Sequence, residues 1–199
     1  MHLVILFGPP AVGKMTVGTE IARRTGLRLF HNHLTVDLAL RFFEFGTPPF
    51  GRLVGEFRRR IFEEVAASDL PGLVFTYVWA LDDPRDRAFV EEVIAVFASR
   101  GTAVHFVELA ATQTERLRRN ETPFRIAQKW PKRDLARSRA HLLETDATYR
   151  LNTDPDGRGF PLAVPHLRLD TTDLSAAEAA DHIVAALGLP PVAGSAPAP

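Results

Sequence analysis

Residues 8–16 read GPPAVGKMT, from Gly8 to Thr16, and this stretch decides the fold of the 199-residue chain. It fits the pattern G-x-x-x-x-G-K, follows an apolar run at 3–7 (LVILF) and precedes a helical pattern at 14–25. In such a loop the backbone curls around an anion, amides and the helix N-terminus point at it, and the lysine reaches the β and γ oxygens of a nucleotide. The alternative is a tight strand-to-helix turn with an exposed lysine. The expected phosphate-binding residues are Gly8, Ala11, Val12, Gly13, Lys14, Met15 and Thr16.

Strand-like and helix-like segments alternate along the rest of the chain. Short apolar, β-rich runs predict strands at 3–7, 27–30, 73–79, 103–109 and 166–170. Amphipathic periodicity and capping residues predict helices at 14–25, 34–44, 52–67, 83–100, 112–120, 134–145 and 175–187. This alternation predicts an α/β fold with a parallel sheet and helices on both faces. We expect one domain over 1–189, followed by a disordered tail at 190–199.

Composition and charge exclude several classes of protein. Apolar residues make up 46% of the chain, which excludes global disorder. The chain has no cysteine, so disulfides, thiolate catalysis and cysteine-ligated zinc are excluded. Bases and acids number 24 each, so bulk charge predicts neither a nucleic-acid nor a membrane partner. We see no signal-peptide pattern or membrane-length apolar run, and we expect a cytoplasmic protein. Oligomeric state is not readable from the sequence.

On the loop and the five-strand pattern, the chain resembles the P-loop small-molecule kinases, such as adenylate kinases, shikimate kinases and antibiotic phosphotransferases. The resemblance implies a three-layer P-loop NTPase fold with a basic lid, and ATP and Mg²⁺ as cofactors. Two departures stand out. Met15 occupies the position where serine or threonine usually follows the lysine, but Thr16 matches the adenylate-kinase version. Ala11 replaces a frequent glycine, and its small size predicts little harm.

A basic segment follows the fourth predicted strand. Nine of the 24 bases fall between 116 and 139, against two acids, Glu121 and Asp134. The segment at about 121–133 resembles the kinase lid, whose arginines neutralise a phosphoryl group in transfer. This resemblance makes Arg125 and Arg133 catalytic candidates; the alternatives are a solvated basic helix or a nucleic-acid patch. It also implies that Arg116 or Arg119 stacks on the adenine, with Thr171 and Thr172 as further adenine contacts.

The acceptor side is expected after the second strand, at His31, His33 and Asp37. The carboxyl ends of parallel strands face the ligand crevice, so these side chains are placed to bind substrate. A neutral imidazole of His31 or His33 can act as a base, as can Asp37, and the choice among the three stays open. These three residues and Arg58 are also expected to bind substrate. A metal site or purely structural histidines are the alternatives. Asp82, after the third strand, and Thr16 are the candidates for holding Mg²⁺.

An insert at about 34–67 resembles the segment that covers the acceptor in this family. It carries six of the 14 phenylalanines, which are Phe42, Phe43, Phe45, Phe50, Phe57 and Phe62. Together with nearby arginines they suit a ring-bearing or anionic acceptor, such as a nucleoside or an aromatic natural product. The competing interpretation places most of these phenylalanines in the core.

Together these features predict an ATP-dependent phosphotransferase that moves the γ-phosphoryl group to a hydroxyl, or less readily to a phosphate, of a small molecule. Two alternatives remain. One is a kinase acting on nucleic-acid ends, and the other is a nucleotide-binding module without transfer chemistry.

Overall fold

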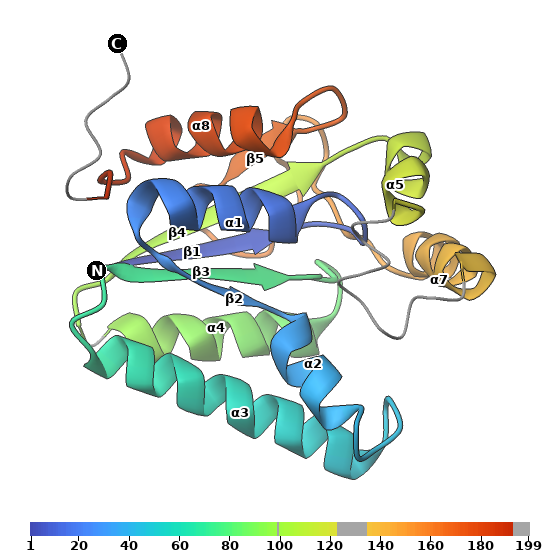
Figure 1. The fold of residues 1–199 in the computed structure, drawn as a ribbon, viewed down its shortest axis with the longest axis horizontal. Helices are drawn as coiled ribbons and strands as arrows, with labels where there is room; N and C mark the ends of the chain where they lie inside the picture. Colours follow the sequence, from blue (N-terminus) through green and yellow to red (C-terminus); the bar gives the residue numbers. More distant parts are fainter. Residues whose placement is uncertain (99, 123–134, 193–199) are drawn as a thin grey trace.

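A computed structural model describes residues 1–98, 100–122 and 135–192. Its five strands form one parallel sheet in the order β2-β3-β1-β4-β5 (Figure 1). The strands are β1 (His2–Phe7), β2 (Arg28–His31), β3 (Gly72–Tyr77), β4 (Ala103–Ala110) and β5 (Leu167–Asp170). The helices are α1 (Lys14–Thr25), α2 (His33–Ala39), α3 (Pro48–Ala67), α4 (Pro84–Ala98), α5 (Gln113–Asn120), α7 (Leu135–Thr148) and α8 (Ala176–Leu187).

The helices cover both faces of the sheet. Helices α1 and α8 pack on one face and α3 and α4 on the other, while α2, α5 and α7 lie toward the ends to which the strands point (Figure 1). One apolar cluster joins Val4 and Leu6 to Ile21 of α1, and a second joins Ile5 and Phe7 to the α3–α4 face. The predicted three-layer α/β architecture is confirmed.

Strand β1 is the central strand of the sheet. Its residues 3–7 are fully buried, and it pairs in parallel with β3 and β4. An uninterrupted apolar run is what a strand covered on both faces requires. The chain therefore leaves the middle of the sheet at Phe7 and enters the loop at 8–13, which lies at the carboxyl edge.

The segments around α2 and α3 differ from the prediction in their bounds. The helix expected at 34–44 spans only His33–Ala39, and the helix expected from 52 begins at Pro48. Gly46 adopts a left-handed φ of 81°, and Thr47 is an extended N-cap. Proline is well suited to the first helical turn, and Pro48 and Pro49 therefore begin α3 four residues before the predicted start.

Glu108 of β4 is a fully buried carboxylate that the sequence analysis did not single out. It accepts hydrogen bonds from Asn152 Nδ2 at 2.8 Å and from the Thr153 hydroxyl at 2.7 Å. His166 Nε2 lies 3.1 Å from Oε2, the oxygen that also accepts the Thr153 hydroxyl. A buried carboxylate is tolerated only when it is satisfied in this way, and the network holds the connection between α7 and β5 against the sheet.

The end of the described chain contacts α1. The Val192 amide donates to the Arg24 carbonyl at 2.9 Å, so residues 190–192 of the predicted tail pack on the domain. Residues 193–199 lie outside the described residues. Within the described part of the chain, no helix combines the length and apolar character needed to cross a membrane.

A histidine pair near the amino ends of β1 and β4 predicts acid-sensitive stability. His2 Nδ1 and His105 Nε2 are 3.1 Å apart, and burial lowers the pKa of both. The unfolded chain therefore binds more protons, so stability present above pH about 6.5 is lost as pH falls. We expect the free energy of unfolding in urea to fall between pH 7.5 and 5.5, and to fall less in His105→Gln. His182→Gln is the control, and an equal pH slope in His105→Gln and wild type would contradict the prediction.

Candidate nucleotide and acceptor site

The loop between β1 and α1 has the backbone of an anion cradle. Gly8 and Gly13 have φ angles of 139° and 106°, and a Cβ on Gly8 would stand 2.3 Å from the Leu109 carbonyl oxygen. Ala11 is also left-handed, with a φ of 65°, a conformation that costs a non-glycine residue about 1–2 kcal/mol. The prediction that Ala11 is harmless considered its size alone, whereas the structure places the cost in its backbone.

Lys14 and Thr16 follow this loop at the first turn of α1. The Lys14 ammonium donates to the carbonyls of Gly8 at 2.6 Å and Pro9 at 2.7 Å, so it lies across the loop. The Thr16 hydroxyl donates to the Gly13 carbonyl at 2.8 Å. The lysine charge is therefore already positioned over the cradle in which an anion would sit.

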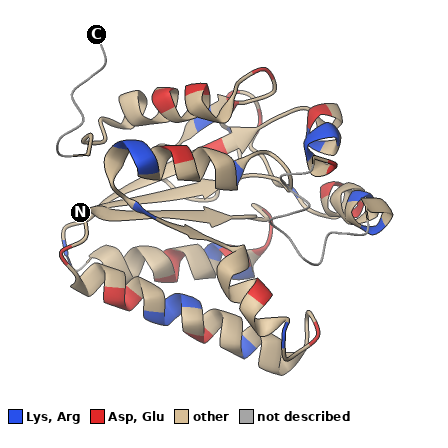
Figure 2. Ribbon diagram, viewed as in Figure 1, with Lys and Arg blue, Asp and Glu red and all other residues tan. Residues whose placement is uncertain are grey.

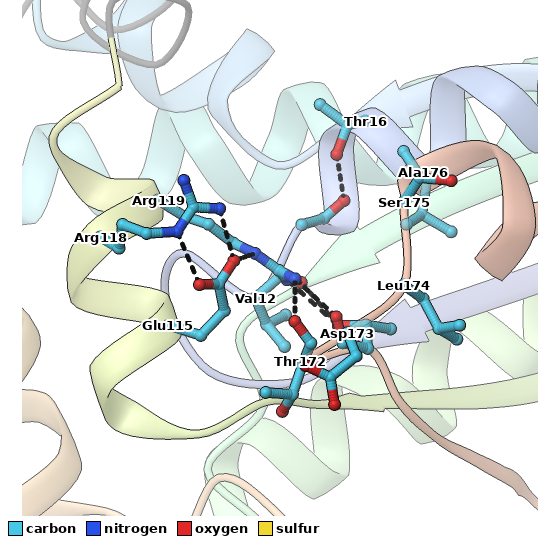
Figure 3. A pocket seen from close by; sticks show the side chains of 13 residues that line it. Val12, Thr16, Glu115, Arg118, Arg119, Thr172, Asp173, Leu174, Ser175 and Ala176 are labelled. Atoms are coloured by element: carbon cyan, nitrogen blue, oxygen red, sulfur yellow. Dashed lines mark hydrogen bonds and ion pairs between the residues drawn. The ribbon is translucent and has the colours of Figure 1, made fainter.

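A cavity of about 490 Å³ opens on one side of the loop (Figure 3). It lies between the start of α1, helix α5 and the connection from β5 to α8. Its lining includes Val12, Gly13, Thr16, Arg118, Arg119, Thr171, Thr172, Asp173 and Ser175. The structure thus brings the predicted Arg119, Thr171 and Thr172 together, in a volume typical of small-ligand pockets.

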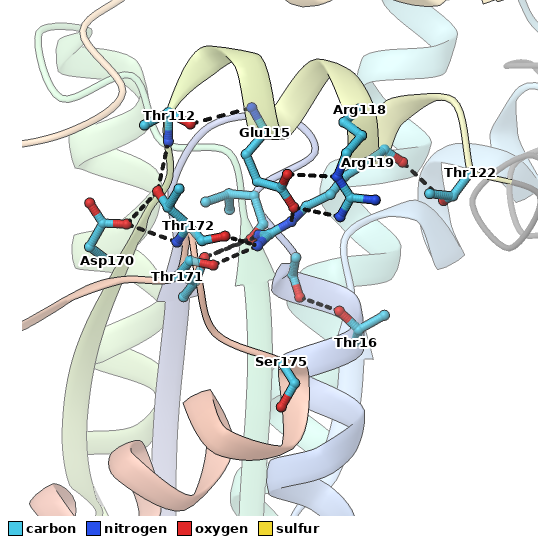
Figure 4. Close-up of polar contacts among 12 residues, drawn as sticks. Thr16, Thr112, Glu115, Arg118, Arg119, Thr122, Asp170, Thr171, Thr172 and Ser175 are labelled. Atoms are coloured by element: carbon cyan, nitrogen blue, oxygen red, sulfur yellow. Dashed lines mark hydrogen bonds and ion pairs between the residues drawn. The ribbon is translucent and has the colours of Figure 1, made fainter.

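Arg119 braces this cavity from α5 (Figure 4). Its guanidinium donates to the Val12 carbonyl at 3.0 Å and to the Thr171 carbonyl at 2.5 Å. Its Nε donates to Glu115 at 2.7 Å. Because these bonds hold the guanidinium in place, Arg119 ties the phosphate loop to the β5–α8 connection.

Arg118 is a cavity residue that sequence reasoning missed. Its side chain is 69% exposed and forms an ion pair with Glu115 at 2.7 Å. The guanidinium groups of Arg118 and Arg119 together lower the pKa of Glu115 to about 2. Arg118 is adjacent to the predicted Arg119 on α5. The one signal for it in the sequence was its planar guanidinium, which can stack on a nucleotide base.

Arg116 has a different place from the one predicted. It is 6% exposed and lines neither cavity. Its Nη2 pairs with Asp146 of α7 at 2.5 Å, and its Nη1 approaches the Pro10 carbonyl at 3.4 Å. The side chain therefore connects α5, α7 and the loop instead of facing a base.

A larger cavity of about 1060 Å³ opens on the other side of the loop. It reaches the carboxyl ends of β2 and β3, helix α2, the start of α4 and helix α7. Its lining includes Lys14, Met15, Thr16, His31, Asn32, His33, Phe45, Asp83, Arg85, Asp86, Arg119, His141, Thr145 and Tyr149. The predicted His31 and His33 thus share one cavity with Lys14, and Asp37 lies behind His33 with its Oδ1 3.6 Å from His33 Nδ1.

Arg58 of α3 is half-buried and does not line this cavity. Its guanidinium donates to Asn32 Oδ1 and, through Nε, to the Thr35 hydroxyl at 3.2 Å. It lies over the Tyr77 ring, and burial lowers its pKa. The predicted direct contact of Arg58 with substrate is not what the structure shows: the side chain supports Asn32, which does line the cavity.

Asp83, and not the predicted Asp82, faces the larger cavity. Asp82 is exposed and accepts the Arg150 amide at 3.2 Å. Asp83 accepts the Arg85 amide at 2.8 Å, as expected of the α4 cap. Thr16 and Asp83 supply hydroxyl and carboxylate oxygens to one cavity, a donor set that suits Mg²⁺ held partly by nucleotide and water. Within the described residues, no group of three or more His, Asp or Glu could hold a metal alone.

The phenylalanines of the insert divide into two groups. Phe50 and Phe62 are buried, at 6% and 1% exposure. Phe42, Phe43, Phe45 and Phe57 are 38–74% exposed. The interpretation that places most of them in the core is therefore wrong, and Phe45 lines the larger cavity.

Helix α7 adds a wall that the sequence analysis did not anticipate. His141, Thr145 and Tyr149 recur at intervals of four residues and line the larger cavity. His141 and Thr145 lie on α7, and Tyr149 follows its last residue with its amide bonded to the Thr145 carbonyl at 3.1 Å. A spacing of four residues places side chains on one helix face, and this spacing was the signal that the sequence offered. Arg125, Arg133 and the rest of the predicted lid from 123 lie outside the described residues.

Comparison with known proteins identifies the fold. A putative kinase from Chloroflexus aurantiacus aligns over 94% of this chain and 96% of its own, with 19% identity and a TM-score of 0.63. The APS kinase of Mycobacterium tuberculosis, in complex with AMPPNP and APS, aligns over 94% and 97%, with 19% identity and a TM-score of 0.57. The tunicamycin resistance protein of Deinococcus radiodurans aligns over 96% and 97%, with 21% identity and a TM-score of 0.54.

No protein-family model and no curated protein sequence matches the chain. The structural likeness therefore carries the assignment, and it shows the three-layer P-loop NTPase fold.

The strained backbone of Ala11 predicts that glycine is better tolerated there. Relief of the left-handed penalty, about 1–2 kcal/mol, exceeds the unfolded-state entropy of glycine, about 0.4–1 kcal/mol. We expect Ala11→Gly to raise the free energy of unfolding in urea by about 0.5–1 kcal/mol. Ala88→Gly on the exposed face of α4 is the control and should lower it by about 1 kcal/mol. A destabilised Ala11→Gly would contradict the assigned conformation.

The Arg116–Asp146 pair predicts a large loss of stability when one partner is removed. The two side chains are 8% and 14% exposed. Asp146→Ala leaves the guanidinium buried without its counter-charge, and we expect the free energy of unfolding to fall by about 3–5 kcal/mol. Asp181→Ala removes the 66%-exposed partner of Arg24 and should cost less than about 1 kcal/mol. Equal losses in urea denaturation would mean that the buried pair is not a brace.

Proposed function

We propose that the chain is an ATP-dependent small-molecule kinase, which transfers the γ-phosphoryl group of ATP to a hydroxyl of its acceptor. The observation that carries the proposal is that one phosphate loop separates two cavities. Val12, Gly13, Thr16 and Arg119 line both. A nucleotide in one cavity would therefore present its terminal phosphate to an acceptor in the other, which is the positioning that phosphoryl transfer needs.

The smaller cavity is the proposed site of the nucleoside. The exposed Arg118 guanidinium offers a flat cation for stacking, and the β5–α8 connection contributes Thr171 and Thr172. Backbone amides of residues 11–16 would hold the β-phosphate, and Lys14 would exchange the Gly8 and Pro9 carbonyls for β and γ oxygens. The APS kinase of the same fold binds AMPPNP, which supports a nucleoside triphosphate as the ligand.

Mg²⁺ would be held at Thr16 and Asp83 together with the nucleotide, and it would supply charge neutralisation on the phosphates. The chain's own contribution on the acceptor side is orientation: His31, His33 and Asn32 surround the space in front of the loop. Arg125 and Arg133, proposed from the sequence alone, would add charge stabilisation in the transition state.

The acceptor is proposed to be a hydroxyl compound with a ring, such as a nucleoside or an aromatic natural product. Phe45 and Tyr149 line the larger cavity and offer aromatic faces for such a ring. A nucleic-acid acceptor has less support, because basic and acidic segments are interspersed on α3, α5 and α7 (Figure 2). We therefore place a small molecule, and not a strand end, in the larger cavity.

Nucleotide binding is tested by a thermal-shift titration with ATP and ADP, with and without Mg²⁺. At a hundredfold excess over the dissociation constant, a ligand adds about 2.7 kcal/mol, which corresponds to a rise in Tm of about 5–10 °C for a domain of this size. We expect the rise in wild type and in the control Arg23→Ala, and its loss in Lys14→Ala. A folded sample whose Tm does not change with either nucleotide would contradict the proposal.

Transfer is tested by ADP release from MgATP in the presence of pyranoses, gluconate, shikimate and nucleosides. Turnover that depends on one class of acceptor and disappears in Lys14→Ala is the expected result. Binding of ATP without acceptor-dependent turnover would favour the nucleotide-binding module.

A further inference from the structure

We infer that His33 is the general base that accepts the acceptor's proton, and that Asp37 is the positioning residue that orients its ring. This inference rests on the proposed kinase function and names the group that performs one step of it. His33 is the first residue of α2 and lines the larger cavity, which also holds Lys14. Its ring is therefore on the acceptor side of the phosphate loop.

Asp37 is placed to orient that ring from behind. It lies one helical turn after His33, where side chains on one face meet. Its Oδ1 is 3.6 Å from His33 Nδ1, is buried, and accepts no hydrogen bond within the described residues. An unsatisfied buried acceptor this close to a ring nitrogen favours a proton on Nδ1, and such bonds tighten when a substrate binds.

The choice of tautomer determines what the ring can do. With its proton on Nδ1 toward Asp37, the neutral imidazole carries its lone pair on Nε2. The carboxylate also stabilises the imidazolium that forms when Nε2 takes a proton, as in other histidine–carboxylate pairs. Asp37 does not line the cavity, so it acts through His33 and does not itself meet the acceptor.

The step balances as follows. The acceptor oxygen forms a bond to the γ-phosphorus, and the bond from that phosphorus to the β–γ bridging oxygen breaks. The electron pair of the broken bond remains on the β-phosphate of ADP. The acceptor's hydroxyl proton moves to His33 Nε2 and is then lost to water.

Several charges besides Asp37 act on His33 in this cavity. The other charged and titratable groups that line it among the described residues are Lys14, His31, Asp83, Arg85, Asp86, Arg119, His141 and Tyr149. Asp37 favours the imidazolium, while Lys14 and the N-terminal end of α2 disfavour it. A general base requires a neutral ring near pH 7, and these charges act on the ring in opposite directions.

Titration of the histidine rings by NMR tests the pair without any turnover. We expect Asp37→Asn to lower the pKa of His33 by about one unit, because the imidazolium loses its carboxylate. The Nδ1–H tautomer should also lose population in this variant. An unchanged His33 pKa and tautomer in Asp37→Asn would overturn the pairing, whether or not the protein is a kinase.

The acid limb of kcat/KM tests the base, measured on whichever acceptor of the panel turns over. We expect His33→Gln to lower kcat/KM by about 10²–10⁴-fold and to remove the acid limb. Asp37→Asn should move the limb to lower pH, and the control His182→Gln, on the exposed side of α8, should keep it. An active wild type whose acid limb survives in His33→Gln overturns the base assignment, whereas a wild type inactive with every acceptor overturns the proposed function.

Discussion

The turn from β1 into α1 is the constraint on which the rest of the structure depends. Strand β1 is buried in the centre of the sheet, and the chain must reverse direction within the loop at 8–13 to start α1. A side chain at position 8 would collide with the Leu109 carbonyl, so the residue there is glycine. Ala11 adopts a left-handed backbone conformation. Strain of this kind persists only where the surroundings enforce it, and here it shapes the loop that we propose holds the phosphates.

Two arginines of α5 fasten the elements around this loop. Arg119 donates to the Val12 carbonyl and to the connection after β5, and Arg116 links Pro10 to Asp146 of α7. Charged groups that are satisfied in this way brace distant segments more specifically than apolar contacts do. The two cavities meet at the loop, where Val12, Gly13 and Thr16 line both, so the proposed phosphoryl transfer would take place at the loop.

Local patterns in the sequence predicted the strands, most helices and the phosphate loop, because apolar runs, capping residues and glycine act within a few positions. The partners that individual side chains would contact were harder to predict. Arg116 was expected to stack on the adenine but pairs with Asp146, which lies 30 residues later. Arg58 was expected to bind the substrate but donates to Asn32. Asp82 and Asp83 are neighbours, and only the turn into α4 determines that Asp83 and not Asp82 lines the larger cavity. Partners far apart in the chain carry no local signal, so such roles come from the fold.

The most direct test of the account is a crystal structure with AMPPNP and Mg²⁺. The account predicts the β-phosphate within hydrogen-bonding distance of the amides of residues 11–16. It places the adenine ring between Arg118 and the residues after β5, and the γ-phosphate facing His33. A nucleotide bound elsewhere, or with its triphosphate directed away from the larger cavity, would contradict it.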